Sequence, residues 1–143
     1  MPIREVRIVV PLEPISVNHY KSMRIIQPKG GKPFISTYVT KAAESFMAAL
    51  AACARGMTIS ADSYSVGFCV YQGAGSRGDV DNYSKCILDG LVKAGVIHSD
   101  AAITDLSMSK RRDRLNPRTE IIVREAGQLE MEFDDHFPSP NNR

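Results

Sequence analysis

Residues 64–95 constrain the fold of this chain more than any other stretch, because the hydrophobic period changes within them. Apolar residues alternate with small or polar ones over residues 64–71, which is the period of a β-strand. A glycine-rich turn follows, and apolar side chains then recur at helical spacing from about Asp81 to Gly95. The segment therefore predicts a strand, a turn and an amphipathic helix.

Four other segments complete the expected architecture. Residues 6–10, 103–110 and 119–123 have the composition of strands, and residues 40–54 are rich in strong helix formers. The order strand, helix, strand, helix, strand, strand favours an α/β (α+β) single domain, in which helices pack on one mixed sheet. Residues 13–34 contain prolines and glycines with little periodicity, and they predict a long loop.

Charge is distributed unevenly over the 143 residues, whose formal net charge is +2. Residues 126–143 hold four acidic residues against Arg143, a net charge of −3, so residues 1–125 carry +5. The acidic stretch also lacks apolar periodicity. We therefore expect one domain over residues 1–125 and a disordered acidic tail over residues 126–143.

Composition also restricts the expected location of the protein. No run of 18 apolar residues suits a membrane span, and the first residues do not resemble an export signal. The three cysteines are odd in number and lack a C-x-x-C spacing, which favours reduced thiols. We expect a cytoplasmic protein without a membrane partner.

Acidic residues cluster around the second predicted helix. Asp79 and Asp81 stand immediately before it and at its start, and Lys85 lies one turn further on the same face. Asp100 follows the helix, at a position from which the chain can return its carboxylate toward the pair. Three carboxylates beside a lysine suit Mg²⁺ or Mn²⁺, which can activate water and neutralise charge on a phosphodiester.

Two ordinary explanations fit the same spacing. An aspartate before a helix is usually an N-cap, and an aspartate with a lysine four residues later is usually a surface pair. Spacing alone therefore leaves capping and surface charge open beside a metal site.

A longer motif resembles a known family. The pattern D-x-D-N-x-x-K over residues 79–85, followed by Asp89, Gly95 and Asp100, resembles the signature of RusA-type Holliday junction resolvases. Residues 11–22 resemble the early proline-rich segment of that family, so the resemblance covers most of residues 5–124. One departure is Ser99, which stands where the family commonly has a second aspartate.

The resemblance implies both a fold and an activity. It implies a RusA-like domain in which Asp79, Asp81 and Asp100 bind a divalent metal ion, Mg²⁺ with Mn²⁺ as the alternative. It also implies that Lys85 is essential for catalysis. It further implies a homodimer that resolves four-way (Holliday) DNA junctions by paired symmetric nicks, in DNA recombination and repair. Asp89 is expected to be a structural partner.

DNA contacts are expected at two places. Basic residues at the end of the strand over residues 103–110 suit phosphate groups; they are Lys110, Arg111, Arg112 and Arg114. Asn18 and Tyr20 in the early loop are candidates for contact near the junction crossover. The alternatives are a solvated turn for the basic residues and packing on the sheet for Tyr20.

Two other functions stay open. The Ser99 departure is compatible with a catalytically weak protein that binds branched DNA without cutting it. Metal chemistry on phosphate does not by itself determine the shape of the DNA, so a flap or single-strand nuclease is the other alternative.

Overall fold

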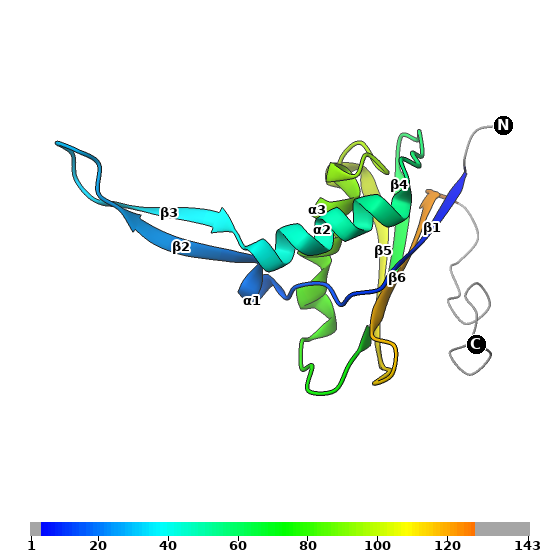
Figure 1. The fold of residues 1–143 in the computed structure, drawn as a ribbon. Coiled ribbons are helices and arrows are strands. Elements are labelled where there is room, and N and C mark those ends of the chain that lie inside the picture. Colours follow the sequence, from blue (N-terminus) through cyan, green and yellow to red (C-terminus); the bar gives the residue numbers. More distant parts are fainter. Residues whose placement is uncertain (1–3, 128–143) are drawn as a thin grey trace.

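The main element of the fold is a four-stranded mixed sheet (Figure 1). A computed structural model describes residues 4–127. The strand order is β1-β6-β4-β5, with β1 (Glu5–Val10), β6 (Arg118–Glu125), β4 (Tyr64–Gln72) and β5 (Ile103–Arg112). β6 pairs antiparallel with β1 and β4, whereas β5 runs parallel to β4. The predicted mixed sheet and single α+β domain are thus confirmed.

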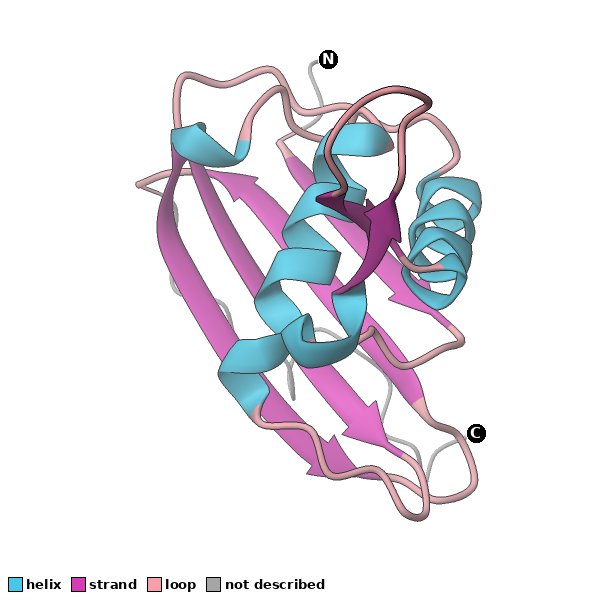
Figure 2. Ribbon diagram, turned by 90° about the vertical axis from the view of Figure 1, so that its left-hand side faces the viewer, coloured by secondary structure: helices cyan, strands magenta, loops and turns pink. Residues whose placement is uncertain are grey.

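Two longer helices cover one face of this sheet (Figure 2), and both were predicted. α2 (Lys41–Ala54) begins where the Thr40 hydroxyl accepts a hydrogen bond from the Ala43 amide, and it ends at Arg55 in the left-handed region. α3 (Ser84–Lys93) is preceded by a 3₁₀ turn, η1 (Val80–Tyr83). No helix in residues 4–127 is long and apolar enough to cross a bilayer.

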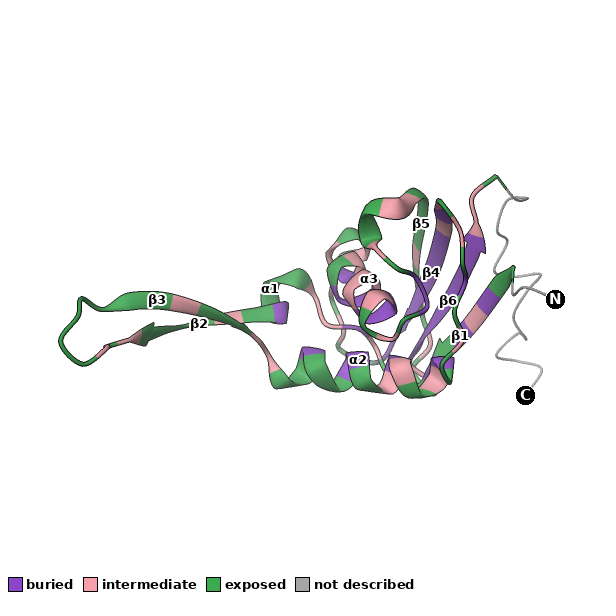
Figure 3. Ribbon diagram, turned by 90° about the horizontal axis from the view of Figure 1, so that it is seen from above, coloured by how far each residue is buried: buried purple, intermediate pink, exposed green. Residues whose placement is uncertain are grey.

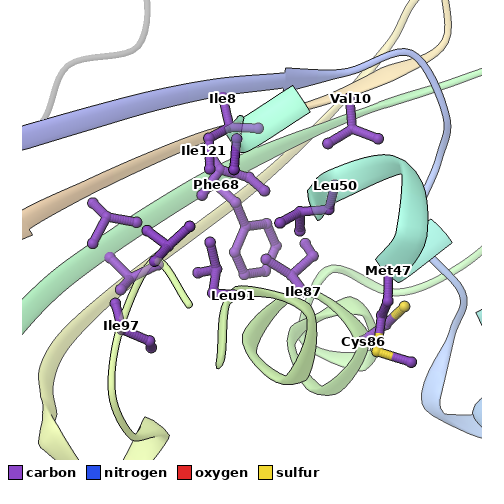
Figure 4. Close-up of a cluster of buried hydrophobic side chains, with 14 of the residues drawn as sticks. Ile8, Val10, Met47, Leu50, Phe68, Cys86, Ile87, Leu91, Ile97 and Ile121 are labelled. Carbon is purple, nitrogen blue, oxygen red and sulfur yellow. The ribbon is translucent and has the colours of Figure 1, made fainter. Parts of the chain in front are cut away.

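The core lies between the helices and the sheet (Figure 4). Phe68 of β4 is fully buried there and points toward α3, which contributes Ile87 and Leu91. Gly90 allows α2 and α3 to approach each other, because a Cβ at this position would lie 3.1 Å from Leu50 Cδ1. The amphipathic patterns of the two helices therefore identified the side that packs on the sheet.

The long loop predicted over residues 13–34 is wrong. A short helix, α1 (Val17–Tyr20), leads into an antiparallel hairpin of β2 (Lys21–Ile26) and β3 (Phe34–Val39). The hairpin projects from the rest of the domain (Figures 1 and 3). Its strands pair only with each other, and Val39 at its root is the one hydrophobic side chain of residues 21–39 that packs against the core. No contrast between a buried and an exposed face therefore marked the two strands in the sequence.

The connection from β4 to β5 determines where the acidic residues lie. Because the two strands are parallel, α3 runs back along the sheet between the end of β4 and the start of β5 (Figure 1). Its ten residues span about 15 Å. Asp79 and Asp100 consequently lie at opposite ends of α3. Residues 128–143, most of the predicted acidic tail, lie outside the described residues.

Candidate active site

The loop that precedes Asp79 is held in place at Gly78. Its carbonyl accepts hydrogen bonds from Gln72 Nε2 (2.9 Å) and Lys110 Nζ (3.2 Å). Gln72 Nε2 also lies 2.8 Å from the hydroxyl of Tyr83. A Cβ at Gly78 would lie 2.2 Å from that hydroxyl, so only glycine fits here. The backbone therefore enters η1 at a defined position.

Asp79 and Asp81 follow this loop directly. Asp79 occupies the N-cap position of η1 with extended backbone (φ −78°, ψ 149°), but its side chain makes no capping hydrogen bond. Asp81 lies in the first turn of η1, and both residues are exposed. Within residues 4–127, neither carboxylate has a hydrogen bond or an ion pair with another side chain. Capping thus does not explain Asp79, and both carboxylates are open to a ligand.

Lys85 is held by Asp89 rather than by Asp81. Lys85 Nζ lies 3.2 Å from Asp89 Oδ1, and the Tyr20 hydroxyl donates to Asp89 Oδ2 at 2.5 Å. Burial and the hydrogen bond to Asp89 raise the pKa of Tyr20, which keeps its phenol a neutral donor. Tyr20 is only 2% exposed, so its ring is not available for stacking on DNA in this structure. Asp89 is the structural partner that the sequence predicted.

A groove of about 570 Å³ opens beside Asp79. Asn18, predicted to contact DNA, lines it together with His19 and Asn82. Three further lining residues were not identified from the sequence; they are Glu13, Ser76 and Arg77. Glu13 Oε2 accepts a hydrogen bond from Ser76 Oγ at 2.8 Å, which ties the two walls together. No local pattern connects residues 63 positions apart, so only the folded chain reveals this groove.

Asp100 lies away from the groove, at the other end of α3. It opens a short 3₁₀ turn, η2 (Asp100–Ala102), whose N-cap is Ser99. Ser99 Oγ accepts a hydrogen bond from the Ala101 amide at 3.1 Å, a capping role for the residue that departs from the family pattern. In the part of the chain that the structure describes, no three histidine, cysteine or acidic side chains gather as a metal-binding group. The expected return of Asp100 to the pair is not seen within one chain.

The predicted basic patch is divided between two faces of the sheet. Lys110 and Arg112 both donate to carbonyls of the loop before Asp79. Arg111 points to the opposite face, as the pairing register requires, and Arg114 is exposed in the following turn. Lys110 and Arg112 therefore support the loop that leads to Asp79.

Arg118 does not belong to an exposed patch, although the sequence groups it with the other basic residues. It is 1% exposed and forms ion pairs with Asp113 (2.8 Å) and Glu120 (2.9 Å). Its guanidinium lies 3.7 Å from the ring centroid of Tyr71. The side chain is thus part of the packing on the face of the sheet opposite the helices.

A known protein family matches most of this chain. Residues 14–124 match the family described as "Endodeoxyribonuclease RusA". The chain belongs to the RusA family. The predicted resemblance is thus confirmed, and the matched range contains both ends of α3 and every residue that lines the groove except Glu13. RusA-family proteins are endodeoxyribonucleases that act on Holliday junctions, so this member is a nuclease of that class. No curated protein sequence matches the chain.

The donor set suits the divalent metal that a RusA-family nuclease implies. Mg²⁺ is commonly held by one or two carboxylates, with water and substrate phosphate oxygens completing its shell. Asp79 and Asp81 supply two carboxylates without side-chain partners in residues 4–127, and the groove leaves room for a phosphate beside Asp79. The residues at this end of α3 therefore fit such an ion.

Proposed function

We propose that this RusA-family chain is a metal-dependent endodeoxyribonuclease that resolves four-way DNA junctions by paired symmetric nicks, in DNA recombination and repair. The observation that carries this proposal is the pair of open carboxylates, Asp79 and Asp81. Asp79 lines the groove, Asp81 follows in the first turn of η1, and Lys85 lies one turn further on. Because its substrate is DNA, we place the protein in the cytoplasm.

Each residue at this end of α3 has a proposed task. Asp79 and Asp81 would hold Mg²⁺ (Mn²⁺ as the alternative), which when bound neutralises charge on the phosphate and lowers the pKa of a bound water. Lys85 places its ammonium beside the reacting phosphate, where it stabilises developing negative charge. Asp89 keeps that ammonium in position, because its Oδ1 accepts from Lys85 Nζ while its Oδ2 accepts from the Tyr20 hydroxyl of α1.

The proposed DNA contacts surround this centre. Asn18 would donate or accept hydrogen bonds inside the groove, and Arg114 is exposed in the loop between β5 and β6. Lys110 and Arg112 of β5 remain proposed phosphate contacts beside the loop, and Arg111 remains one on the opposite face of the sheet. Together they would hold the junction in register with the carboxylates.

Asp100 requires a second subunit if it serves the same centre. About 15 Å of helix separates it from Asp81 within one chain. We propose a homodimer, since paired symmetric nicks require two centres, with Asp100 of one subunit reaching the Asp79–Asp81 pair of the other. This arrangement keeps the three carboxylates that the family resemblance implies.

The decisive experiment compares DNA substrates. Purified protein is incubated with a labelled synthetic four-way junction, a flapped duplex and a linear duplex, with Mg²⁺, Mn²⁺ or a chelator, beside Asp81→Asn. Paired nicks in the junction alone, lost with chelator or in the variant, are the expected result. Junction binding without nicks would instead support the catalytically weak binding protein, and preferential cutting of the flap would support the flap nuclease.

A further inference from the structure

The β2–β3 hairpin is the largest feature that the site at α3 does not use. We call residues 21–39 the arm. It stands clear of the main sheet and helices, and most of its residues are exposed (Figure 3). A two-stranded hairpin has little stability of its own and no core to bury here, so its shape serves something other than folding.

The arm has a strong excess of positive charge. It contains four cations, Lys21, Arg24, Lys29 and Lys32, and no acidic residue occurs anywhere in residues 14–43. The whole chain has a net charge of only +2. All four cations are exposed, and within residues 4–127 none of them forms an ion pair. The arm therefore presents uncompensated charge that suits a polyanion.

The two faces of the arm differ in chemistry. Residues directly opposite each other in an antiparallel pair share a face. One face carries Arg24, whose guanidinium lies 5.3 Å from the ring centroid of Tyr38, and Phe34 near the tip. The other face carries aliphatic side chains that are 67–77% exposed; they are Met23, Ile25 and Ile35. Planar and aromatic groups stack on unpaired bases, whereas aliphatic groups suit protein contacts.

The root of the arm is fixed to the candidate active site. β2 follows Tyr20, whose hydroxyl is bonded to Asp89. Beyond β3, Thr40 returns to the same place, since its amide donates to the Tyr20 carbonyl (3.0 Å) and its hydroxyl to the His19 carbonyl (2.9 Å). His19 also lines the groove. The direction of the arm is thus set relative to the groove, and a nucleic acid in the groove would pass its root.

We propose that the arm is a second DNA-contacting element, which binds phosphates of a junction branch away from the cleavage centre. The positive charge of the arm, which no carboxylate of residues 21–39 offsets, complements the negative phosphates of the DNA backbone. The face that carries Arg24 and Tyr38 suits stacking with bases left unpaired at the branch point. Two like-charged arms would repel each other, so charge favours DNA over a second copy of the chain as the occupant. This inference rests on the proposed function.

The test removes charge at the tip of the arm, where no side-chain contact is disturbed. Lys29→Gln/Lys32→Gln is compared with Arg55→Gln/Lys93→Gln, which removes two exposed cations at the C-terminal ends of α2 and α3. The dissociation constant for a four-way junction is measured in chelator over a series of salt concentrations. The arm variant should reduce the salt slope by about two and weaken binding about tenfold, and the control should match the wild type.

Other outcomes separate the arm from the active site. If the wild type binds and nicks junctions but the arm variant has the wild-type slope, the arm proposal is overturned while the proposed function stands. A second variant, Ile25→Thr/Ile35→Thr, tests a subunit contact by light scattering. If the salt slope of the arm variant is unchanged and this second variant has half the molecular mass of the wild type, the arm is a subunit contact instead. If the wild type neither binds nor nicks a junction, the proposed function itself fails.

Discussion

The two ends of α3 carry acidic side chains in very different surroundings. At the N-terminal end, a loop held by Gln72 presents Asp79 and Asp81 beside a groove and a positioned lysine. At the C-terminal end, Asp100 follows a serine cap, and no groove residue is near it in the chain. The two ends of α3 thus show what makes a carboxylate a candidate for catalysis. Its backbone is fixed, its side chain is open to a ligand, and a positively charged side chain lies nearby.

The largest expected effect is at the N-terminal end. Asp81→Asn should lower the rate of junction nicking by about 10³-fold, because it removes a metal-binding carboxylate. Junction binding in chelator and the circular dichroism spectrum should not change, because Asp81 makes no side-chain contact within residues 4–127. Wild-type nicking by this variant would remove Asp81 from the site.

A mixture of two inactive variants tests the C-terminal end. Asp81→Asn and Asp100→Asn should each be inactive alone, yet mixing them should restore about a quarter of the nicking rate, since half of the dimers would hold one intact composite centre. Those dimers should cut one strand rather than two. No recovery after subunit exchange, confirmed by mass spectrometry of mixed dimers, would contradict a centre shared between subunits.

Lys85 and Lys93, at the two ends of α3, allow the same comparison to be made with lysines. Lys85→Ala should lower kcat about 10²-fold, because the positioned ammonium is lost at the reacting phosphate. Lys93→Ala removes an exposed lysine from the last turn of α3 and should leave kcat unchanged. Both rates are measured by single-turnover cleavage of the junction. Equal effects of the two substitutions would mean that only overall charge matters.

The fixed loop before Asp79 predicts a smaller effect. Gly78→Ala would place a methyl group against the buried ring of Tyr83, so the loop must shift. Nicking should fall about tenfold, because misplaced reactive groups lose rate steeply. Ala74→Ser, at an exposed position of the same loop, should have no effect. Thermal unfolding of both variants separates loop displacement from global destabilisation.

The smallest expected effect concerns the support of Lys85. Tyr20→Phe keeps the buried ring but removes the donor to Asp89 Oδ2. It should cost about 1 kcal/mol of stability and lower kcat about threefold without changing KM. Urea unfolding and steady-state kinetics check the two parts. A change in KM alone would point to DNA contact by Tyr20 rather than positioning of Lys85.

Much of the fold followed from local patterns. The strand before residue 72 and both long helices were predicted from the period of their apolar residues, and the first strand and the two final strands from their composition. The arm was missed because both of its faces are largely exposed, so its sequence has no alternation of buried and exposed positions. Among the predicted site residues, Asp79 and Asp81 lie at the same end of α3 because they are near in sequence, whereas the position of Asp100 depends on the direction in which α3 runs.

The sequence by itself therefore determined the elements of the main sheet, the two long helices, the acidic motif and the RusA family. Only the tertiary structure decided that the Tyr20 hydroxyl donates to Asp89, that Glu13 and Ser76 are joined across one groove, and that Tyr20 is buried. The physical reason is the range of the interactions. Hydrophobic period and capping act over a few residues, whereas these contacts join segments that meet only after the sheet has formed.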